Sequence, residues 1–317
     1  MIRRHLPSAL AMLMGRTLPG PSEVEQQKLG AGQIIYILDE PVAEVNELAG
    51  RVTMGPNPTG APPGDHGTGV ACLAAGEQHG LAVGARIVSV PLVASMTTAQ
   101  VRAQLNWILG EEQARPGCAV VNISQAPQPE FDAELTALVA AGCVLICAAG
   151  NSGQPGLTWP ASRPDVLAVA GCDQNGVKID ASRWDIFGRQ RQVFARGNNV
   201  ETTAAGGGNQ AMSGTSPAAP QVAGLAAMWC EIAGWYGDAL HIVDAIARNA
   251  TPGIVTAPFG TNLRLAYAGW RLTKPWSDDG YADANPDVRA NWGRLMLEHY
   301  TEYGGATEGR GFIEDAG

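Results

Sequence analysis

The chain has 317 residues, 40 of them glycine, and 45% of its residues are hydrophobic. This composition is typical of a folded α/β enzyme with one large domain, or one domain and a small appendage, rather than of a disordered or fibrous protein. The formal net charge of −9 and the pI near 5.0 argue against nucleic acid as the main partner, because they supply no basic surface for phosphates. No apolar run approaches the roughly 20 residues of a membrane-spanning helix.

Residues 1–30 carry two conflicting signals. Arg3 and Arg4, followed by the mostly apolar residues 6–15, have the order of a secretory signal peptide. However, Pro7 interrupts this short run, and no clear cleavage site follows it. We therefore predict an N-terminal lead-in that is helical or disordered, with a secretory signal as the alternative.

From residue 31 onwards, short apolar runs alternate with segments of helix length. Such alternation predicts a mostly parallel sheet with helices on both faces. The expected strands are Ile34–Leu38, Ala85–Pro91, Ala119–Ile123, Val144–Ala148 and Val166–Ala170, and the expected helices are Thr98–Glu112, Phe131–Ala141 and two that begin near His66 and Ser216.

The first of these strands ends abruptly in an acid, Asp39. A buried parallel strand delivers the side chain at its carboxyl end to the edge of the sheet where ligands bind. Asp39 is therefore a candidate catalytic carboxylate. A strand-end cap is the structural alternative.

His66 lies in a glycine-rich turn, Asp65-His66-Gly67-Thr68-Gly69, that opens a helix of small apolar residues. An imidazole in this position, with a carboxylate near it, is a candidate general base. The alternative is a structural histidine whose ring nitrogens are hydrogen-bonded within the fold. The other histidines lack such a setting, and we interpret them as surface or structural residues: His5, His79, His241 and His299.

Ser216 follows a glycine-loosened turn, Gly214-Thr215, and precedes a helix of small residues. The unpaired N–H groups of a first helical turn favour a nearby negative charge, and Pro217 costs no hydrogen bond there. A nucleophile that must form an oxyanion needs such a setting. For an isolated Gly-Thr-Ser, the alternative is a serine that caps the helix.

A fourth segment is an apolar strand that runs into Ala148-Ala149-Gly150-Asn151. Together, the four segments resemble those of the subtilisin-like serine proteases (subtilases), and the resemblance extends from about Gln33 to Trp270. In that family the acid, the base and the nucleophile follow one another along the chain in the order Asp, His and Ser.

The resemblance implies a subtilisin-like three-layer α/β fold and a serine endopeptidase that cleaves polypeptides through an acyl-enzyme. Asp39, His66 and Ser216 would form the catalytic triad. The side chain of Asn151, together with the backbone N–H of Ser216, would stabilise the oxyanion. A turn asparagine is the alternative for Asn151, and an inactive protein that binds peptides in the same cleft is the contrasting function.

By the same resemblance, two segments would line the peptide-binding cleft. An extended substrate would pair with the first segment as an added strand, and the small residues of the second would leave room for a sizeable apolar P1 side chain. An ordinary loop is the alternative for the first segment. The segments are Ser124, Gln125 and Ala126, and Ala148, Ala149 and Gly150.

The chain departs from the usual subtilase pattern beside Asp39. Glu40 and Pro41 stand where a small hydroxyl residue and glycine are usual, and with Val42 they resemble the Asp-Gly-Pro-Val form of proteases that process cyanobactin-type precursor peptides. This favours, as an alternative, a processing protease or macrocyclase of peptide natural-product maturation. Neighbouring residues at a strand end point apart, so we expect Glu40 to face solvent.

Two further departures lie elsewhere. Pro217 and Gln221 replace a methionine and a histidine that are common in the family. The acid-rich loops that bind calcium in secreted subtilases are not evident, so we expect no obligatory metal and no cofactor.

The six cysteines occupy positions suited to small buried side chains, in expected helices or beside apolar strands. On an intact strand, Cys143 and Cys147 would be about 13 Å apart, which is too far for a disulfide. We expect mostly reduced, buried thiols, and this favours a cytoplasmic setting over a secreted one.

The composition changes after Trp270, where a segment rich in charged residues, aromatics and glycine begins. We therefore predict a catalytic domain over residues 31–272 and a small helical appendage over residues 273–317. The appendage would either dock a partner or substrate, or cap the catalytic domain.

Overall fold

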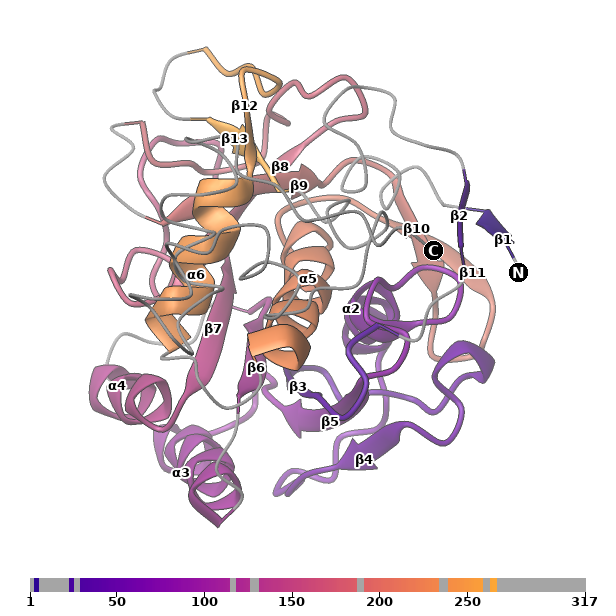
Figure 1. The fold of residues 1–317 in the computed structure, drawn as a ribbon. Coiled ribbons are helices and arrows are strands. Elements are labelled where there is room, and N and C mark those ends of the chain that lie inside the picture. The colour runs from indigo at the N-terminus through magenta and orange to yellow at the C-terminus, as the bar shows by residue number, and fades with distance from the viewer. Residues whose placement is uncertain are drawn as a thin grey trace, which may run out of the picture.

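The computed structural model describes residues 3–5, 23–25, 29–114, 118–125, 131–186, 191–233, 239–258 and 263–266. These residues form one central sheet between layers of helices, with two short antiparallel ribbons beside it (Figure 1).

The central sheet has nine strands among the described residues, in the order β12-β13-β9-β8-β7-β6-β3-β5-β4. All neighbouring strands pair in parallel except β12 and β13 at one edge. The strands are β3 (Ile34–Asp39), β4 (Val52–Met54), β5 (Arg86–Pro91), β6 (Ala119–Ile123), β7 (Cys143–Ala148), β8 (Leu167–Cys172), β9 (Gln192–Arg196), β12 (Thr251–Pro252) and β13 (Arg264–Leu265).

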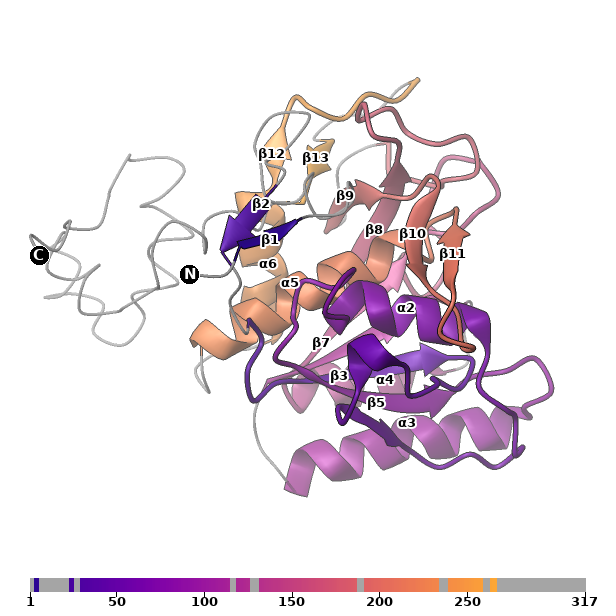
Figure 2. The same cartoon turned by 90° about the vertical axis from the view of Figure 1, so that its right-hand side faces the viewer.

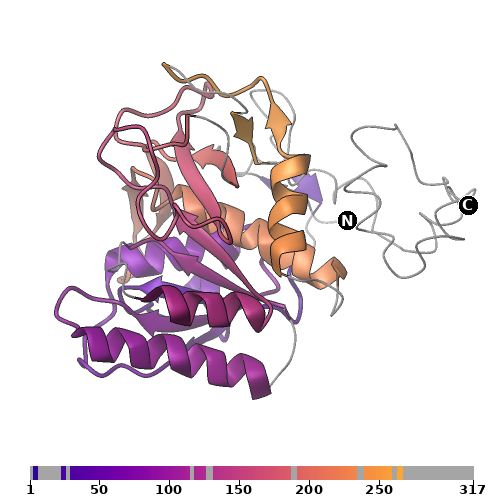
Figure 3. The same ribbon diagram turned by 90° about the vertical axis from the view of Figure 1, so that its left-hand side faces the viewer.

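Alternate residues of the buried strands face opposite sides of the sheet. On β3, Ile35 and Ile37 join the apolar core on one side, and Tyr36 and Leu38 join the core on the other. Both sides are covered, which explains the uninterrupted apolar runs in the sequence. Helices α2 (Asp65–Ala75), α5 (Ala218–Ala233) and α6 (Ala239–Asn249) cover the first side, and α3 (Thr98–Ala114) and α4 (Asp132–Ala140) cover the second (Figures 2 and 3). The predicted three-layer α/β fold is confirmed.

The strand order reverses at β3, because the chain passes from β3 to β5 on one side and then places β6 on the other. In open α/β sheets, ligands bind outside the carboxyl ends of the strands at such a reversal. Asp39 ends β3 and Ser124 follows β6, so the fold brings both residues to this place.

The expected strands and helices are present, with ends that differ by one or two residues. The sequence analysis missed α6, β9 and the hairpin formed by β10 (Val200–Thr203) and β11 (Asn209–Met212). Strand β9 is buried at every position although it begins with Gln192 and ends with Arg196, so it shows neither alternation nor a clean apolar run. No helix in the described part of the chain is long and apolar enough to cross a membrane.

The N-terminal part of the chain contributes a short ribbon. For residues 1–30 we predicted a helix or disorder, but the described parts pair as a short antiparallel ribbon of β1 (Arg3–His5) and β2 (Glu23–Glu25). Strands of three residues are too short to show a period in sequence. The predicted appendage, residues 273–317, lies outside the described residues.

Four cysteines are buried thiols outside any disulfide, as expected: Cys72, Cys143, Cys147 and Cys172. Burial raises the pKa of the Cys172 thiol to about 12, and burial likewise raises the pKa values of Cys72 and Cys147, so these thiols remain protonated. The expectation of reduced thiols is wrong for the other two, because Cys118 and Cys230 form a disulfide across 112 residues of sequence. Their proximity arises from the packing of α5 on β6, which the sequence does not reveal.

Candidate active site

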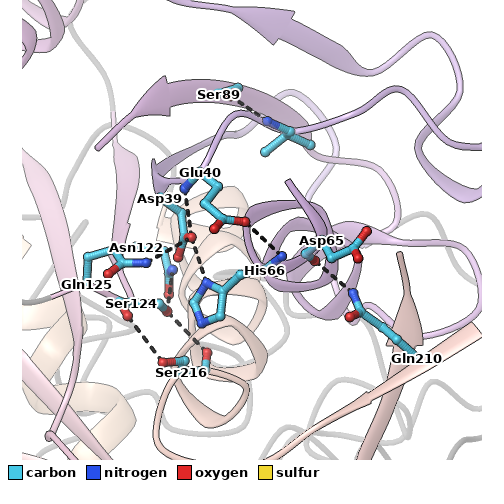
Figure 4. Close-up of polar contacts among 11 residues, drawn as sticks. Asp39, Glu40, Asp65, His66, Ser89, Asn122, Ser124, Gln125, Gln210 and Ser216 are labelled. Carbon is cyan, nitrogen blue, oxygen red and sulfur yellow. Dashed lines mark hydrogen bonds and ion pairs between the residues drawn. The ribbon is translucent and has the colours of Figure 1, made fainter. Parts of the chain in front are cut away.

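The candidate site lies where the carboxyl ends of β3 and β6 meet the first turns of α2 and α5 (Figure 4). Asp39 comes from the end of β3, and His66 comes from the first turn of α2. Ser216 lies just before α5. Three residues that are far apart in sequence therefore converge at one edge of the sheet.

The carboxylate of Asp39 orients the imidazole of His66. The Nδ1 atom of His66 lies 2.7 Å from Oδ1 of Asp39, whose side chain is fully buried. The same oxygen accepts hydrogen bonds from the backbone N–H of Glu40 at 2.7 Å and from Nε2 of Gln125 at 3.3 Å. Because the carboxylate can only accept, Nδ1 carries the proton, and Nε2 is the nitrogen left to act as a base.

Two opposing effects set the pKa of His66. Burial of the ring acts to lower the pKa, but the hydrogen bond and negative charge of Asp39 and the charge of Glu40 outweigh burial and raise the pKa above its ordinary value. The imidazolium form is thus stabilised here, as a general base requires.

Ser216 is fixed to the end of β6 by reciprocal hydrogen bonds. Its hydroxyl donates to the backbone oxygen of Ser124 at 3.2 Å, and the hydroxyl of Ser124 donates to the backbone oxygen of Ser216 at 3.1 Å. Asn122 supports Ser124 with a hydrogen bond of 3.0 Å from Nδ2 to Oγ. In Figure 4 the His66 ring lies between Asp39 and Ser216, so rotation of the Ser216 hydroxyl away from Ser124 turns it towards the imidazole.

Asn151 lies after β7 and contacts Thr215, the residue before Ser216. Its side-chain oxygen accepts hydrogen bonds from the backbone N–H and the hydroxyl of Thr215, at 2.8 and 3.0 Å. With this oxygen occupied, the exposed amide NH₂ is the part of Asn151 that a substrate oxygen can meet. Gly214 is required here, because it has φ of +129° and a Cβ on it would lie 3.1 Å from the Asn151 oxygen.

The described residues of the predicted peptide-binding segments lie at the carboxyl ends of two neighbouring strands, β6 and β7. Ile123 of β6 pairs with Cys147 of β7, so Ser124 and Ala148 follow at the same edge of the sheet. Ala149 is fully buried in the core, whereas Ala148 and Gly150 are half-buried. Gly150 has φ of +106° and donates its N–H to the Thr215 hydroxyl at 3.1 Å. Ala126 lies outside the described residues.

Glu40 does not simply face solvent, so that prediction is wrong. Its side chain is half-buried, and its carboxylate accepts a hydrogen bond from the backbone N–H of His66 at 3.1 Å. The rule that neighbouring strand residues point apart fails here because the chain has already left β3 at Glu40. Glu40 also lines a hollow of about 570 Å³ beside His66, together with Pro63, Gly64, Asp65, Gln210 and Met212.

The sequence analysis named Gln125 for peptide binding and missed its contact with Asp39. It also missed Thr215 as the support of Asn151, and Asn122 as the support of Ser124. Thr215 could have been found from its place directly beside Ser216. Among the described residues, no group of three or more His, Cys, Asp and Glu side chains is placed to hold a metal ion.

Comparisons with known proteins identify the family of this chain. The sequence profile of the Subtilase family matches residues 31–270. Subtilisin-like protease 4 of Arthroderma gypseum is 31% identical over 281 residues, which cover 84% of this chain and 69% of that protein. The profile match and this relative show a subtilisin-like serine protease, which is a hydrolase. The chain belongs to the subtilase family.

Solved structures show the same fold. A cold adapted subtilisin-like serine proteinase superposes with a TM-score of 0.73 at 26% identity, over 83% of this chain and 98% of that chain. The prenylagaramide maturation protease PagA superposes with a TM-score of 0.64 at 24% identity, over 76% of this chain and 94% of that chain. The second likeness is one of fold alone.

Proposed function

We propose that this chain, a hydrolase of the subtilase family, cleaves peptide bonds within polypeptides through an acyl-enzyme on Ser216. The observation that carries the proposal is the 2.7 Å contact between His66 and the buried Asp39, with Ser216 on the other side of the ring. In this assignment residues 31–272 are the catalytic domain.

The proton transfers follow from the tautomer of His66. Nε2 of His66 accepts the proton of the Ser216 hydroxyl as Oγ attacks the peptide carbonyl, and it then gives that proton to the leaving amine. Asp39 keeps Nδ1 protonated and stabilises the imidazolium. Water repeats the sequence on the acyl-enzyme, with His66 again as the base, and releases the new carboxylate.

The tetrahedral intermediate needs donors for its oxyanion. The amide NH₂ of Asn151 and the backbone N–H of Ser216, at the amino end of α5, supply them. The hydrogen bonds from Thr215 to the Asn151 oxygen hold the amide in this orientation before substrate arrives. Such preorganisation avoids the cost of turning the donor during the reaction.

The substrate polypeptide lies between the two segments at the carboxyl ends of β6 and β7. Ser124 and Gln125 form one wall, and Ala148 and Gly150 form the other; Ala126 and Ala149 complete the two segments. The backbone oxygen of Ser124, which accepts the Ser216 hydroxyl in the free enzyme, becomes available to a substrate N–H once that hydroxyl turns to His66.

The direct test is labelling with a fluorophosphonate, read by intact mass, on the wild type and on Ser216→Ala. We expect one label on the wild type and none on the variant, because only an activated serine reacts. A folded wild type that takes up no label would contradict the proposal and would favour a protein that binds peptides without cleaving them.

A second candidate is the maturation of a precursor peptide. The sequence Glu40-Pro41-Val42 after Asp39 favours it, and the fold likeness to PagA is consistent with it. An amine of the substrate, instead of water, would then attack the acyl ester on Ser216, so that the acyl group forms a new amide and the Ser216 hydroxyl is released, giving a ligated or cyclic peptide.

Mass spectrometry of the products distinguishes the two acceptors. The enzyme is incubated with a labelled peptide in the presence of an excess amine nucleophile. A product that carries the amine in preference to water supports transpeptidation, whereas a free carboxylate as the dominant product supports plain hydrolysis.

A further inference from the structure

Glu40 joins the end of β3 to the first turn of α2, the turn that carries His66. Its Oε2 atom accepts the backbone N–H of His66 at 3.1 Å, and its own backbone N–H donates to Oδ1 of Asp39 at 2.7 Å. Figure 4 shows the Glu40 carboxylate directed towards the start of α2, on the side away from Ser216. One residue thus contacts both the acid and the base of the proposed triad.

Two glycines make room for Glu40. A Cβ on Gly64 would lie 2.0 Å from Oε2 of Glu40, and a Cβ on Gly67 would lie 2.0 Å from its backbone oxygen. Any larger side chain at either position would displace the Glu40 segment. The Gly64 N–H also donates to the oxygen of Pro41 at 2.9 Å. The turn is therefore built around the backbone and the carboxylate of Glu40.

Among the described residues that contact the His66 ring or line the hollow beside it, the charged ones are all acidic. The end of β3 contributes Asp39 and Glu40, and the first turn of α2 contributes Asp65. The carboxylate of Asp65 accepts the N–H of Ala205 at 2.9 Å. Gln125 and Ser216, and Gln210 and Met212 of β11, face the same region without charge. Glu40 adds to the effect of Asp39 in raising the pKa of His66.

We propose that Glu40 is a positioning residue for the peptidase reaction: its carboxylate holds the first turn of α2 in place and stabilises the imidazolium that His66 becomes during acyl transfer. This inference rests on the proposed function for its catalytic consequence. The coupling between Glu40 and His66 exists in the protein whether or not a substrate is cleaved, so the two can be tested separately.

The test compares two substitutions. Glu40→Gln keeps an oxygen that can accept the His66 N–H but removes the charge. Glu40→Ala removes both. Glu111→Gln is the matched control, because Glu111 is exposed on α3, on the other side of the sheet. Each protein is measured for thermal midpoint and for the pH dependence of kcat and of kcat/KM on a peptide substrate.

For Glu40→Gln we expect the acid limb of kcat/KM to move to lower pH by about half a unit, since one neighbouring charge at a partly exposed site is lost. The plateau kcat falls by a few-fold with KM unchanged, and the thermal midpoint stays near that of the wild type. Glu40→Ala shows the same shift with a lower thermal midpoint, and Glu111→Gln shows no change.

The His66 ring is titrated directly by NMR in the Ser216→Ala background, with and without Glu40→Gln. A fall of the His66 pKa by the same half unit supports the proposal. The proposal would be overturned if Glu40→Gln changed neither the acid limb of kcat/KM nor the NMR titration of His66. An absence of fluorophosphonate labelling in the wild type would overturn the proposed function instead, and the ring titration would still decide the role of Glu40.

Discussion

Two histidine–carboxylate pairs lie near opposite ends of α2, and they serve different purposes. His66 contacts Asp39 at 2.7 Å where α2 begins, and His79 contacts Glu47 at 2.9 Å in the loop after α2 ends. The two contacts are chemically alike. The His66 side chain is 31% exposed, whereas that of His79 is 9% exposed. Exposure is what separates them.

The second pair, His79 and Glu47, connects the loop after α2 to the segment before β4. Glu47, in the 3-10 helix η1 (Asn46–Leu48), accepts the backbone N–H groups of Gln78 and His79 at 3.2 Å each, and the hydroxyl of Thr203 from β10. Burial acts to raise the pKa of Glu47, but the hydrogen bonds from His79 and Thr203 outweigh it and hold the pKa at about 2. A pair enclosed in this way supports the fold, whereas a pair open to a cleft can carry a proton to a substrate.

The largest effect on rate is expected at the more exposed pair, His66 and Asp39. Asp39→Asn should lower kcat by about 10⁴-fold, because an amide no longer fixes the reactive tautomer of His66. The thermal midpoint should change little. Steady-state kinetics and calorimetry check both, with the exposed Asp180→Asn as control. An unchanged kcat in Asp39→Asn would show that Asp39 is not part of the triad.

The largest effect on stability is expected at the buried pair, His79 and Glu47. Glu47→Ala leaves His79, two backbone N–H groups and a hydroxyl without their acceptor, so it should lower the free energy of unfolding by about 3–5 kcal/mol. The kcat per folded molecule should be unchanged. Urea unfolding measures the loss, and Glu77→Ala, at a neighbouring exposed position, provides the control. A Glu47 variant as stable as that control would contradict the structural role.

A third prediction concerns Asn151, which belongs to the same proposed site as His66. Asn151→Ala should lower kcat by about 10²–10³-fold with little change in KM, because the lost hydrogen bond forms only to the oxyanion. Active-site titration gives the concentration of competent enzyme, and Ser152→Ala controls for loop disturbance. A change confined to KM would assign Asn151 to ground-state binding.

The two pairs should respond to acid in different pH ranges. His66 acts as a base only when deprotonated, so kcat/KM should rise with pH through its elevated pKa. Glu47 has a folded pKa of about 2, below its unfolded value of about 4.3, so its contribution to stability is present above pH 5 and is lost as the pH falls towards 2. Urea midpoints measured from pH 6 to pH 3 should fall more steeply for the wild type than for Glu47→Gln. Parallel curves would show that Glu47 is not linked to folding.

Most of the chemistry of the site could be predicted from sequence, because it depends on where elements begin and end. An apolar run that stops at Asp39 places that residue at the edge of a parallel sheet. Glycine-rich turns before small-residue helices place His66 and Ser216 in or beside first helical turns. These signals are local, and the order of the residues along the chain identified the family.

What the sequence could not supply is contact between segments that are distant along the chain. The Glu40 carboxylate turns towards α2 because Gly64 and Gly67 leave space for it, and this space exists only after α2 packs against the end of β3. The disulfide between Cys118 and Cys230 likewise follows from the packing of α5 on β6.

The sequence by itself determined the α/β class, the residues of the proposed triad and the family, because periodicity and helix or strand ends are set by neighbouring residues. The tertiary structure alone decided that His66 faces an open cleft while His79 is sealed, and that Glu40 and Thr215 support the site. The physical reason is that burial, and with it the strength of charges and hydrogen bonds, depends on which distant segments pack together.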